Sequence, residues 1–183
     1  GFRSMSQSAN SQTAFLGLGS NLGDRAANLL RAVSALVNGG LQLVAASSIY
    51  ETDPVDYLAQ PKFLNQVIAV TAPGIEPYSL LRFCLETETG LGRERTIPRG
   101  ARNIDIDLLL FGDFILNGEF GGVHLILPHP RLHLRRFVLE PLAEIAPQLP
   151  HPLLGQTVEQ LLAAACIATH ADSTVRIYRE NSQ

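Results

Sequence analysis

The chain has 183 residues, of which 46% are hydrophobic, and a formal net charge of −3 at pH 7. This length fits one domain, and this apolar fraction is typical of a globular protein rather than a disordered one. No apolar run approaches the roughly 20 residues needed to cross a bilayer, and the net negative charge argues against a general surface for nucleic acid or acidic membranes.

The ends of the chain and its two cysteines carry expectations of their own. Residues 1–4 precede Met5 and resemble a cloning remnant. Residues 5–12 are too polar to pack, so we expect residues 1–12 to be disordered and residues 13–183 to form a single domain. Cys84 and Cys166 lie in apolar helical patterns, which predicts two reduced core residues in a cytoplasmic protein.

Hydrophobic periodicity and turn residues predict the secondary structure. In chain order we expect a strand over 14–19, a helix capped from residues 20–24 and ending at Gly39-Gly40, strands over 41–50 and 63–71, a helix over 77–90, a strand over 104–111, a short strand pair within 113–127, a partly helical segment over 131–142, a helix from 157 to about 168 opened by a capping box at residues 157–160, and an edge strand over 175–179.

The order of these elements predicts the fold. Strand, helix, strand, strand, helix, strand is the ferredoxin-like order, and the C-terminal helices are left to cover the other face of the sheet. We therefore predict an α/β (α+β) fold, with a ferredoxin-like βαββαβ core extended into three layers, α/β/α. The run Leu108-Leu109-Leu110 predicts burial on both faces, and hence a central position for its strand.

Asp105-Ile106-Asp107 is the sharpest chemical signal in the sequence. Residues two apart in a strand point to the same face, so both carboxylates project together while Ile106 points the other way. Two such carboxylates repel each other unless a cation lies between them. Carboxylate oxygens completed by water and substrate phosphate are how proteins usually hold Mg²⁺, so the pair predicts a magnesium site.

Arginine is concentrated just before this strand. The chain has one lysine against thirteen arginines, and seven of the arginines fall between Arg93 and Arg136. Four of them, Arg93, Arg95, Arg99 and Arg102, lie in a predicted loop from Gly92 to Asn103. The planar guanidinium fork matches phosphate oxygens, and phosphoryl transfer depends on positioning and on stabilising negative charge. A solvated basic loop is the alternative.

Two further residues are candidates for the same site. Glu88 continues the inward stripe of its predicted helix, where it either is exposed by fraying or accepts a hydrogen bond from substrate or from a loop arginine. His129 lies between Pro128 and Pro130 and close to three arginines, which favours contact with phosphate over binding of zinc.

The glycines near the start of the chain do not form a known nucleotide loop. Gly17-Leu18-Gly19-Ser20-Asn21-Leu22-Gly23 lies between a predicted strand and a helix, but its spacing differs by one residue from the dinucleotide-binding pattern. It also lacks the Gly-Lys-Ser/Thr of a P-loop. An ATP site in this chain is therefore of neither common type.

Taken together, the motifs resemble those of the 6-hydroxymethyl-7,8-dihydropterin pyrophosphokinases, enzymes of folate biosynthesis. The resemblance spans about residues 14 to 160 and rests on the order and spacing of several segments. These are residues 19–23, 48–52, 63–65, 91–93, 102–107, 127–130, 135–137 and 141–147.

This resemblance implies an activity and a set of site residues. It implies that Asp105 and Asp107 bind two Mg²⁺ ions bridging the phosphates of ATP, and that the hydroxymethyl oxygen of the pterin attacks the β-phosphorus while AMP leaves. Nucleotide and phosphate contacts are implied for Glu88, Arg93, Arg95, Arg102, His129 and Arg135, with Arg93 and Arg102 as catalytic residues. The pterin ring is expected between Phe63 and Phe137, with Thr52 and Asn65 at its edge and the backbone of Val55 beside it.

The chain departs from the family pattern in two segments, and alternatives remain open. Many members have Trp-Gly-Pro-Arg where this chain has Arg99-Gly100-Ala101-Arg102, and Asp53 stands where proline is frequent. A metal-dependent nucleotidyl transferase or nuclease is the alternative enzyme, and it predicts a third acidic ligand. A non-enzymatic ferredoxin-like binding module is the other alternative. We expect a monomer that binds ATP and the pterin but neither nucleic acid nor a membrane.

Overall fold

The computed structural model describes residues 12–53, 61–92, 103–168 and 175–180 of the chain. Their elements, in chain order, are β1 (Thr13–Ser20), α1 (Arg25–Asn38), β2 (Gln42–Ala46), β3 (Tyr50–Thr52), β4 (Phe63–Thr71), α2 (Pro77–Gly90), β5 (Asp105–Phe111), β6 (Leu116–Phe120), β7 (Val123–Leu127), a 3₁₀ turn (Leu132–Leu134), α3 (Arg136–Ile145), α4 (Val158–Ala168) and β8 (Val175–Ile177). Each element predicted from the sequence is present with its bounds within a few residues, except that the strand predicted over 41–50 is two strands.

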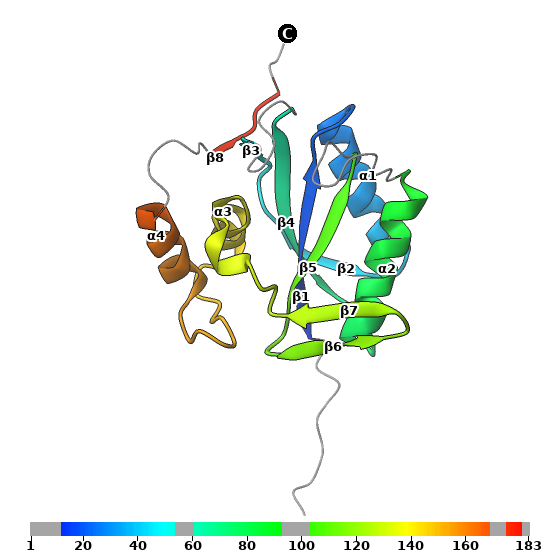
Figure 1. The fold of residues 1–183 in the computed structure, drawn as a ribbon. Helices are drawn as coiled ribbons and strands as arrows, with labels where there is room; N and C mark the ends of the chain where they lie inside the picture. Colours follow the sequence, from blue (N-terminus) through cyan, green and yellow to red (C-terminus); the bar gives the residue numbers. More distant parts are fainter. Residues whose placement is uncertain (1–11, 54–60, 93–102, 169–174, 181–183) are drawn as a thin grey trace, which may run out of the picture.

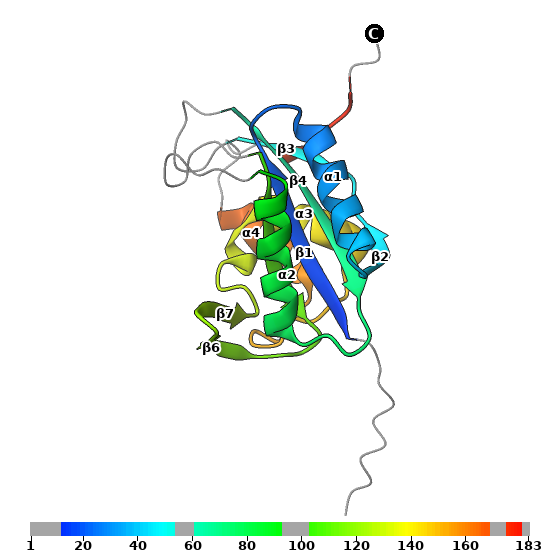
Figure 2. The same ribbon diagram turned by 90° about the vertical axis from the view of Figure 1, so that its right-hand side faces the viewer.

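The predicted three layers are confirmed. A six-stranded antiparallel sheet lies in the middle, with α1 and α2 over one face and α3 and α4 over the other (Figures 1 and 2). One hydrophobic core, which contains Leu16, Leu36 and Ile68, fills the α1/α2 side. A second core, which contains Val67 and Leu139, fills the α3/α4 side. No helix in the described part of the chain is long and apolar enough to span a bilayer.

The sheet has the ferredoxin-like strand order. Its path is β5-β1-β4-β3-β8, and β2 pairs with β4 alongside β3. The single strand predicted over 41–50 is therefore two strands on one edge of β4. The break falls at Ser47, whose Oγ accepts a hydrogen bond from the Val67 N–H at 3.0 Å and so replaces one rung of the ladder.

The predicted central position of the strand with Asp105 and Asp107 is wrong. β5 pairs only with β1 among the described strands, so it is an edge of the sheet. Its leucines are nevertheless buried on both faces, because Leu108 packs in the core on the α1/α2 side while Leu109 and Leu110 pack in the core on the α3/α4 side. The His129 N–H donates to the Leu109 carbonyl at 2.9 Å, which satisfies one acceptor of the exposed ladder.

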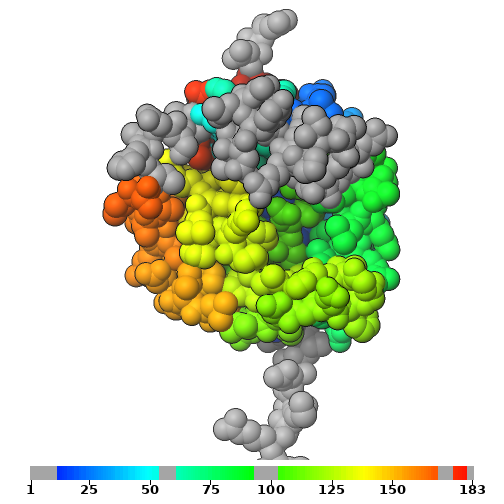
Figure 3. Space-filling model, viewed as in Figure 1, coloured from blue at the N-terminus to red at the C-terminus, as the bar shows by residue number. Residues whose placement is uncertain are grey.

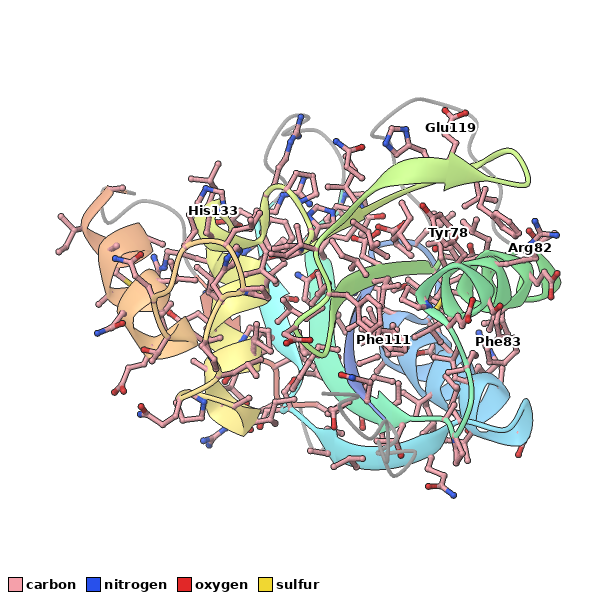
Figure 4. All side chains as sticks on the ribbon, turned by 90° about the horizontal axis from the view of Figure 1, so that it is seen from below. Tyr78, Arg82, Phe83, Phe111, Glu119 and His133 are labelled. Carbon is pink, nitrogen blue, oxygen red and sulfur yellow. The ribbon has the colours of Figure 1, made fainter. Side chains whose placement is uncertain are left out.

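The hairpin itself is anchored on α2. Phe120 packs against Tyr78 with ring centroids 5.5 Å apart, and Arg82 donates to the carbonyl of Gly121 at 3.4 Å (Figure 4). On the surface the hairpin lies beside α3, so the two together flank the edge strand (Figure 3). The hydrophobic run of β5 therefore indicates burial between the two helical layers, with the hairpin beside its free edge, and not a second sheet partner.

Local signals in the sequence act as predicted at two helix starts. Asp24 caps α1 by accepting from the Ala27 N–H at 3.1 Å. Thr157 and Gln160 form the predicted capping box of α4, with reciprocal backbone bonds of 2.9 and 3.2 Å. The prediction for the cysteines holds only in part, because Cys84 is buried whereas Cys166 is exposed.

Glu144 of α3 ties that helix to the sheet. Its carboxylate accepts from the Ser48 N–H, from the Ser48 hydroxyl at 2.7 Å and from the Tyr50 hydroxyl at 2.7 Å. Burial raises the pKa of the carboxyl, but the hydrogen bonds from Tyr50 and Ser48 outweigh burial and hold the pKa below its ordinary value. These hydrogen bonds to Glu144 therefore fix α3, the helix that carries Phe137, against the chain between β2 and β3.

We expect Glu144→Gln to lower the free energy of unfolding by about 1 to 3 kcal/mol, because one acceptor oxygen and the charge of the bonds are lost. Glu140→Gln, on the same helix, removes an i,i+4 pair with Arg136 at 3.1 Å and should cost only about 0.5 kcal/mol. Urea unfolding of both variants measures the difference. Equal losses would show that Glu144 does not anchor α3.

Candidate functional site

A row of paired residues crosses three strands at one end of the sheet. Gly19 of β1 lies opposite Asp105 of β5 on one side and opposite Asn65 of β4 on the other. Gly17 of β1 lies opposite Asp107 of β5. Paired residues of antiparallel strands share a face, and this is the face that α3 covers. The candidate metal residues and the candidate pterin residues are therefore brought to one face, separated by glycine.

The two aspartates occupy the positions predicted for them within β5. Asp105 and Asp107 are partly buried, whereas Ile104, Ile106 and Leu108 are buried in the core on the α1/α2 side. Both carboxylates thus lie on the opposite face from these apolar side chains. No group of three His, Cys, Asp or Glu side chains suited to a metal ion occurs within the described residues. Two carboxylates completed by water and phosphate fit Mg²⁺ rather than a fully protein-built metal site.

Glu88 is buried rather than exposed by fraying. It lies at the end of α2 with 3% of its surface accessible, and its carboxylate accepts from the N–H of Ile106 at 2.6 Å. That N–H belongs to the residue between the two aspartates. Glu88 thus fixes the backbone of the edge strand β5 between Asp105 and Asp107, a role that the sequence did not suggest.

His129 lies on the same side as the aspartates. Burial, followed by the positive charges of Arg135 and Arg131, lowers the pKa of His129 to about 4, although Asp105 opposes the shift. Its Nδ1 accepts from the Arg131 N–H at 3.2 Å, so the neutral ring carries its proton on Nε2. A neutral imidazole with one fixed N–H donor, close to two arginines, suits a phosphate oxygen.

The residues expected around the pterin are only partly described. Asn65 donates from Nδ2 to the Thr52 hydroxyl at 2.7 Å, and both residues are buried. Phe63 pairs with Thr52 in the ladder and is half-buried. Phe137 packs on the core of the α3 side, and the Arg135 guanidinium lies 5.4 Å from its ring centroid. That the ring lies between Phe63 and Phe137 stays a prediction, and Val55 lies outside the described residues.

The arginine-rich segment of the candidate site is described only at its two flanks. Arg93, Arg95, Arg99 and Arg102 lie outside the described residues. Its two flanks are described, and they adjoin each other because Asn103 donates from Nδ2 to the Leu91 carbonyl at 2.9 Å. Both ends of the segment therefore meet beside β5, next to Asp105.

Sequence reasoning missed the role of Gly17 and Gly19, which it weighed only as a nucleotide loop. A Cβ at Gly19 would lie 3.3 Å from Asn65 Oδ1 and 3.8 Å from the ring of Phe63. The absence of a side chain here leaves the floor of the site open between Asp105 and Asn65. The available signal was the alternation of glycine at two positions of one strand, on the face that the aspartates share.

Fold and site together define a class. A ferredoxin-like sheet that presents two carboxylates beside an arginine-rich segment is suited to transfer of a phosphoryl group from a magnesium-bound nucleotide. The family model of 7,8-dihydro-6-hydroxymethylpterin-pyrophosphokinase (HPPK) matches residues 15–147. The chain belongs to this family.

Named relatives agree with that assignment. The chain is 42% identical over 137 residues to the 2-amino-4-hydroxy-6-hydroxymethyldihydropteridine pyrophosphokinase of Bacillus subtilis, covering 74% of this chain and 79% of the relative. It is 44% identical over 151 residues to the enzyme of the same name from Methylorubrum extorquens, covering 82% and 91%. It also matches the Folic acid synthesis protein fol1 of Schizosaccharomyces pombe at 37% identity, covering 85% of this chain but only 21% of that protein.

A solved structure supports the fold. The wild-type HPPK-DHPS of Plasmodium falciparum superposes with a TM-score of 0.68 at 17% sequence identity, covering 87% of this chain and 45% of that one. The chain therefore spans less than half of the length of this structure, and a fifth of the length of the fission yeast protein.

We expect Glu88→Ala to speed hydrogen exchange at the Ile106 amide by about 10- to 100-fold, since a charge-assisted hydrogen bond of about 1.5 to 3 kcal/mol is lost. Glu86→Ala, exposed on the same helix, should leave that amide unchanged. Exchange measured by NMR on both variants tests this. An Ile106 amide equally protected in Glu88→Ala would contradict the role of Glu88 in holding β5.

We expect the pKa of His129, about 4 in the free protein, to rise when a non-hydrolysable ATP analogue binds, because phosphate charge stabilises the imidazolium. The His151 ring, which contacts His133, should not shift in the same way. NMR titration of the ring protons measures both. At His129 the unfolded chain binds more protons than the folded protein between about pH 4 and 6.5, so the contribution of this residue to stability should be lost as pH drops through that window. An unchanged pKa in the complex would place the phosphates elsewhere.

Proposed function

We propose that this protein transfers a diphosphate group from ATP to 6-hydroxymethyl-7,8-dihydropterin, giving the pterin diphosphate and AMP in folate biosynthesis. The observation that carries the proposal is the row in which Gly19 separates Asp105 from Asn65. It brings two carboxylates and a pair of hydrogen-bonding side chains to one face of the sheet, which supports a metal site beside a pocket for a flat heterocycle. Membership of the family identifies the two substrates that we propose. The row of paired residues supports binding of ATP beside Asp105 and of the pterin beside Asn65.

In the proposed reaction the hydroxymethyl oxygen of the pterin forms a bond to the β-phosphorus of ATP. The bond from that phosphorus to the oxygen of the α-phosphate breaks, AMP leaves with the electron pair, and the hydroxyl proton is lost to solvent. Such a displacement requires in-line positioning and stabilisation of charge on the phosphate oxygens rather than covalent chemistry by the protein.

Asp105 and Asp107 would hold Mg²⁺, and we propose two ions for the site. When bound, the metal neutralises phosphate charge and orients the β- and γ-phosphates. His129, as a neutral donor from Nε2, and Arg135 would bind phosphate oxygens. We propose the same for Arg93, Arg95 and Arg102, with Arg93 and Arg102 acting on the transferred group, because both ends of their segment adjoin β5.

At the other end of the row we propose that Asn65 and Thr52 hydrogen-bond the edge of the pterin, with the backbone of Val55 beside it. Their mutual bond at 2.7 Å already orients both side chains. Phe63 and Phe137 would supply apolar faces to the ring. Glu88 is proposed as a support of β5 rather than as a ligand of ATP, since it is buried on Ile106.

The two alternative functions, a nuclease or nucleotidyl transferase and a non-enzymatic binding module, fit the site less well. A nuclease or nucleotidyl transferase would require a third acidic ligand, and the described residues contain no such cluster. A plain binding module has no use for two carboxylates that share one face with His129. We further propose a cytoplasmic monomer, and the net charge of −3 supports the absence of nucleic-acid and membrane partners.

The proposed reaction is tested by mixing the protein, ATP, Mg²⁺ and the pterin and quantifying AMP, ADP and the pterin product by chromatography. AMP and pterin diphosphate should appear in a 1:1 ratio and without ADP. Formation of ADP with a pterin monophosphate would contradict diphosphate transfer. No turnover of the pterin by the folded protein would contradict the proposal as a whole.

We expect Asp105→Asn and Asp107→Asn each to lower kcat/KM by about a thousandfold or more, since loss of the charge that organises the phosphates removes about 4 kcal/mol of barrier lowering. Asp113→Asn, exposed beyond the end of β5, is the matched control and should keep wild-type rates. Steady-state kinetics at saturating Mg²⁺ measures all three. Near-normal rates in either β5 variant would refute the metal assignment.

A further inference from the structure

A network of charged side chains lies behind the proposed pterin pocket, on the opposite face of the sheet. Residues alternate along a strand, so Glu51 points away from the face of its neighbour Thr52, toward the start of α1. Its two carboxylate oxygens accept from Arg25 at 3.1 Å and from Arg176 at 3.3 Å. The Glu51 and Arg25 side chains are about four-fifths buried, whereas Arg176 is more than half exposed.

Arg25 joins the two strands that carry the pocket. The same guanidinium nitrogen that binds Glu51 also donates to the carbonyl of Lys62 at 2.8 Å. Glu51 immediately precedes Thr52, and Lys62 immediately precedes Phe63. Thr52 and Phe63 are themselves a cross-strand pair. One side chain at the first turn of α1 therefore fixes β3 against β4 at the level of the proposed pterin contacts.

The C-terminal strand completes the network from the outside. β8 pairs with β3 so that Val175 lies opposite Thr52 and Arg176 opposite Glu51. The Tyr178 N–H donates to the Ile49 carbonyl at 2.7 Å, and the Arg25 guanidinium lies 5.7 Å from the centroid of the Tyr178 ring. β3 and β8 have three residues each, too few to hold their positions by ladder bonds alone. The side-chain network supplies what the short ladder lacks.

We propose that Arg25, Glu51 and Arg176 are positioning residues for the pterin pocket, acting through the backbone that precedes Thr52 and Phe63. This inference rests on the proposed function. It goes beyond that function because none of the three residues lies on the pocket face, and because Arg176 lies outside the segment matched by the family model. We expect the network to affect the affinity for the pterin and not the affinity for ATP. The described residues proposed to bind metal and phosphate belong to β5 and to the segment after β7, away from β3.

The more deeply an ion pair of the network is buried, the larger the loss of pterin affinity that we expect when it is broken. Arg25→Gln breaks both the ion pair and the bond to Lys62, and should weaken pterin binding about tenfold or more. Glu51→Gln keeps one acceptor and should have an intermediate effect. Arg176→Gln removes the most exposed partner and should weaken pterin binding by about two- to threefold. The affinity for a non-hydrolysable ATP analogue with Mg²⁺ should stay within about twofold in all three variants.

The experiment measures the Kd of the pterin and of the ATP analogue by calorimetry on the full chain, with Arg82→Gln on α2 as the charge-matched control. A second readout is the NMR signal of the Asn65 side-chain amide in the ligand-free protein, which should move in Arg25→Gln and not in the control, because Asn65 bonds Thr52.

Selective loss of pterin affinity with a moved Asn65 signal supports the network. Unchanged pterin affinity in Arg25→Gln, or parallel losses for both ligands, overturns it. If Arg25→Gln does not fold, Glu51→Gln decides by the same criteria. A wild-type protein that binds the ATP analogue but not the pterin would instead refute the proposed function, so the two failures are distinguishable.

Discussion

The antiparallel register of β1 is the constraint on which the site depends. β1 pairs with β5 on one side and with β4 on the other, and this places Gly19 between Asp105 and Asn65. Neighbouring strands lie about 4.8 Å apart, so Asp105 and Asn65 are separated by about 10 Å across the glycine. That spacing leaves room for a phosphate chain at one end and a ring at the other. A slip of one residue in either pairing would turn one set of side chains to the opposite face.

The strands at the two ends of the site, β5 and β3, are each anchored through a glutamate on the α1/α2 side of the sheet. Glu88 accepts from the backbone of β5 between the aspartates, and Glu51 binds Arg25 and Arg176 behind β3. Both strands lie at or near an edge, where fewer ladder bonds are made than in the middle of the sheet. One face therefore carries the proposed chemistry while the other supplies charged anchors for the strands that carry it. Burial and Glu88 raise the pKa of Cys84 to about 12, so this thiol stays protonated within that supporting layer.

Much of the fold and part of the site could be predicted from the sequence. The shared face of Asp105 and Asp107 followed from the two-residue period of a strand, and the capping box at Thr157 followed from side-chain chemistry. The edge position of β5 could not be predicted, because an apolar run indicates that a strand is buried but not which elements bury it. The bond from Ile106 to Glu88 joins residues 18 apart and depends on how α2 packs, which no local pattern encodes. The importance of Gly19 depends equally on its partners across the sheet.

The position of the metal relative to the row Asp105–Gly19–Asn65 is the most direct test of the proposed site. Mn²⁺ can replace Mg²⁺ in complex with an ATP analogue, and its unpaired electrons broaden NMR signals with a steep dependence on distance. A metal held by Asp105 and Asp107 should strongly broaden the backbone amides of Gly17, Gly19, Asp105 and Asp107, broaden Asn65 less, and also broaden the pterin protons when the second ligand is present. Broadening centred on Arg25, Glu51 and Tyr178, on the far side of the sheet, would contradict it.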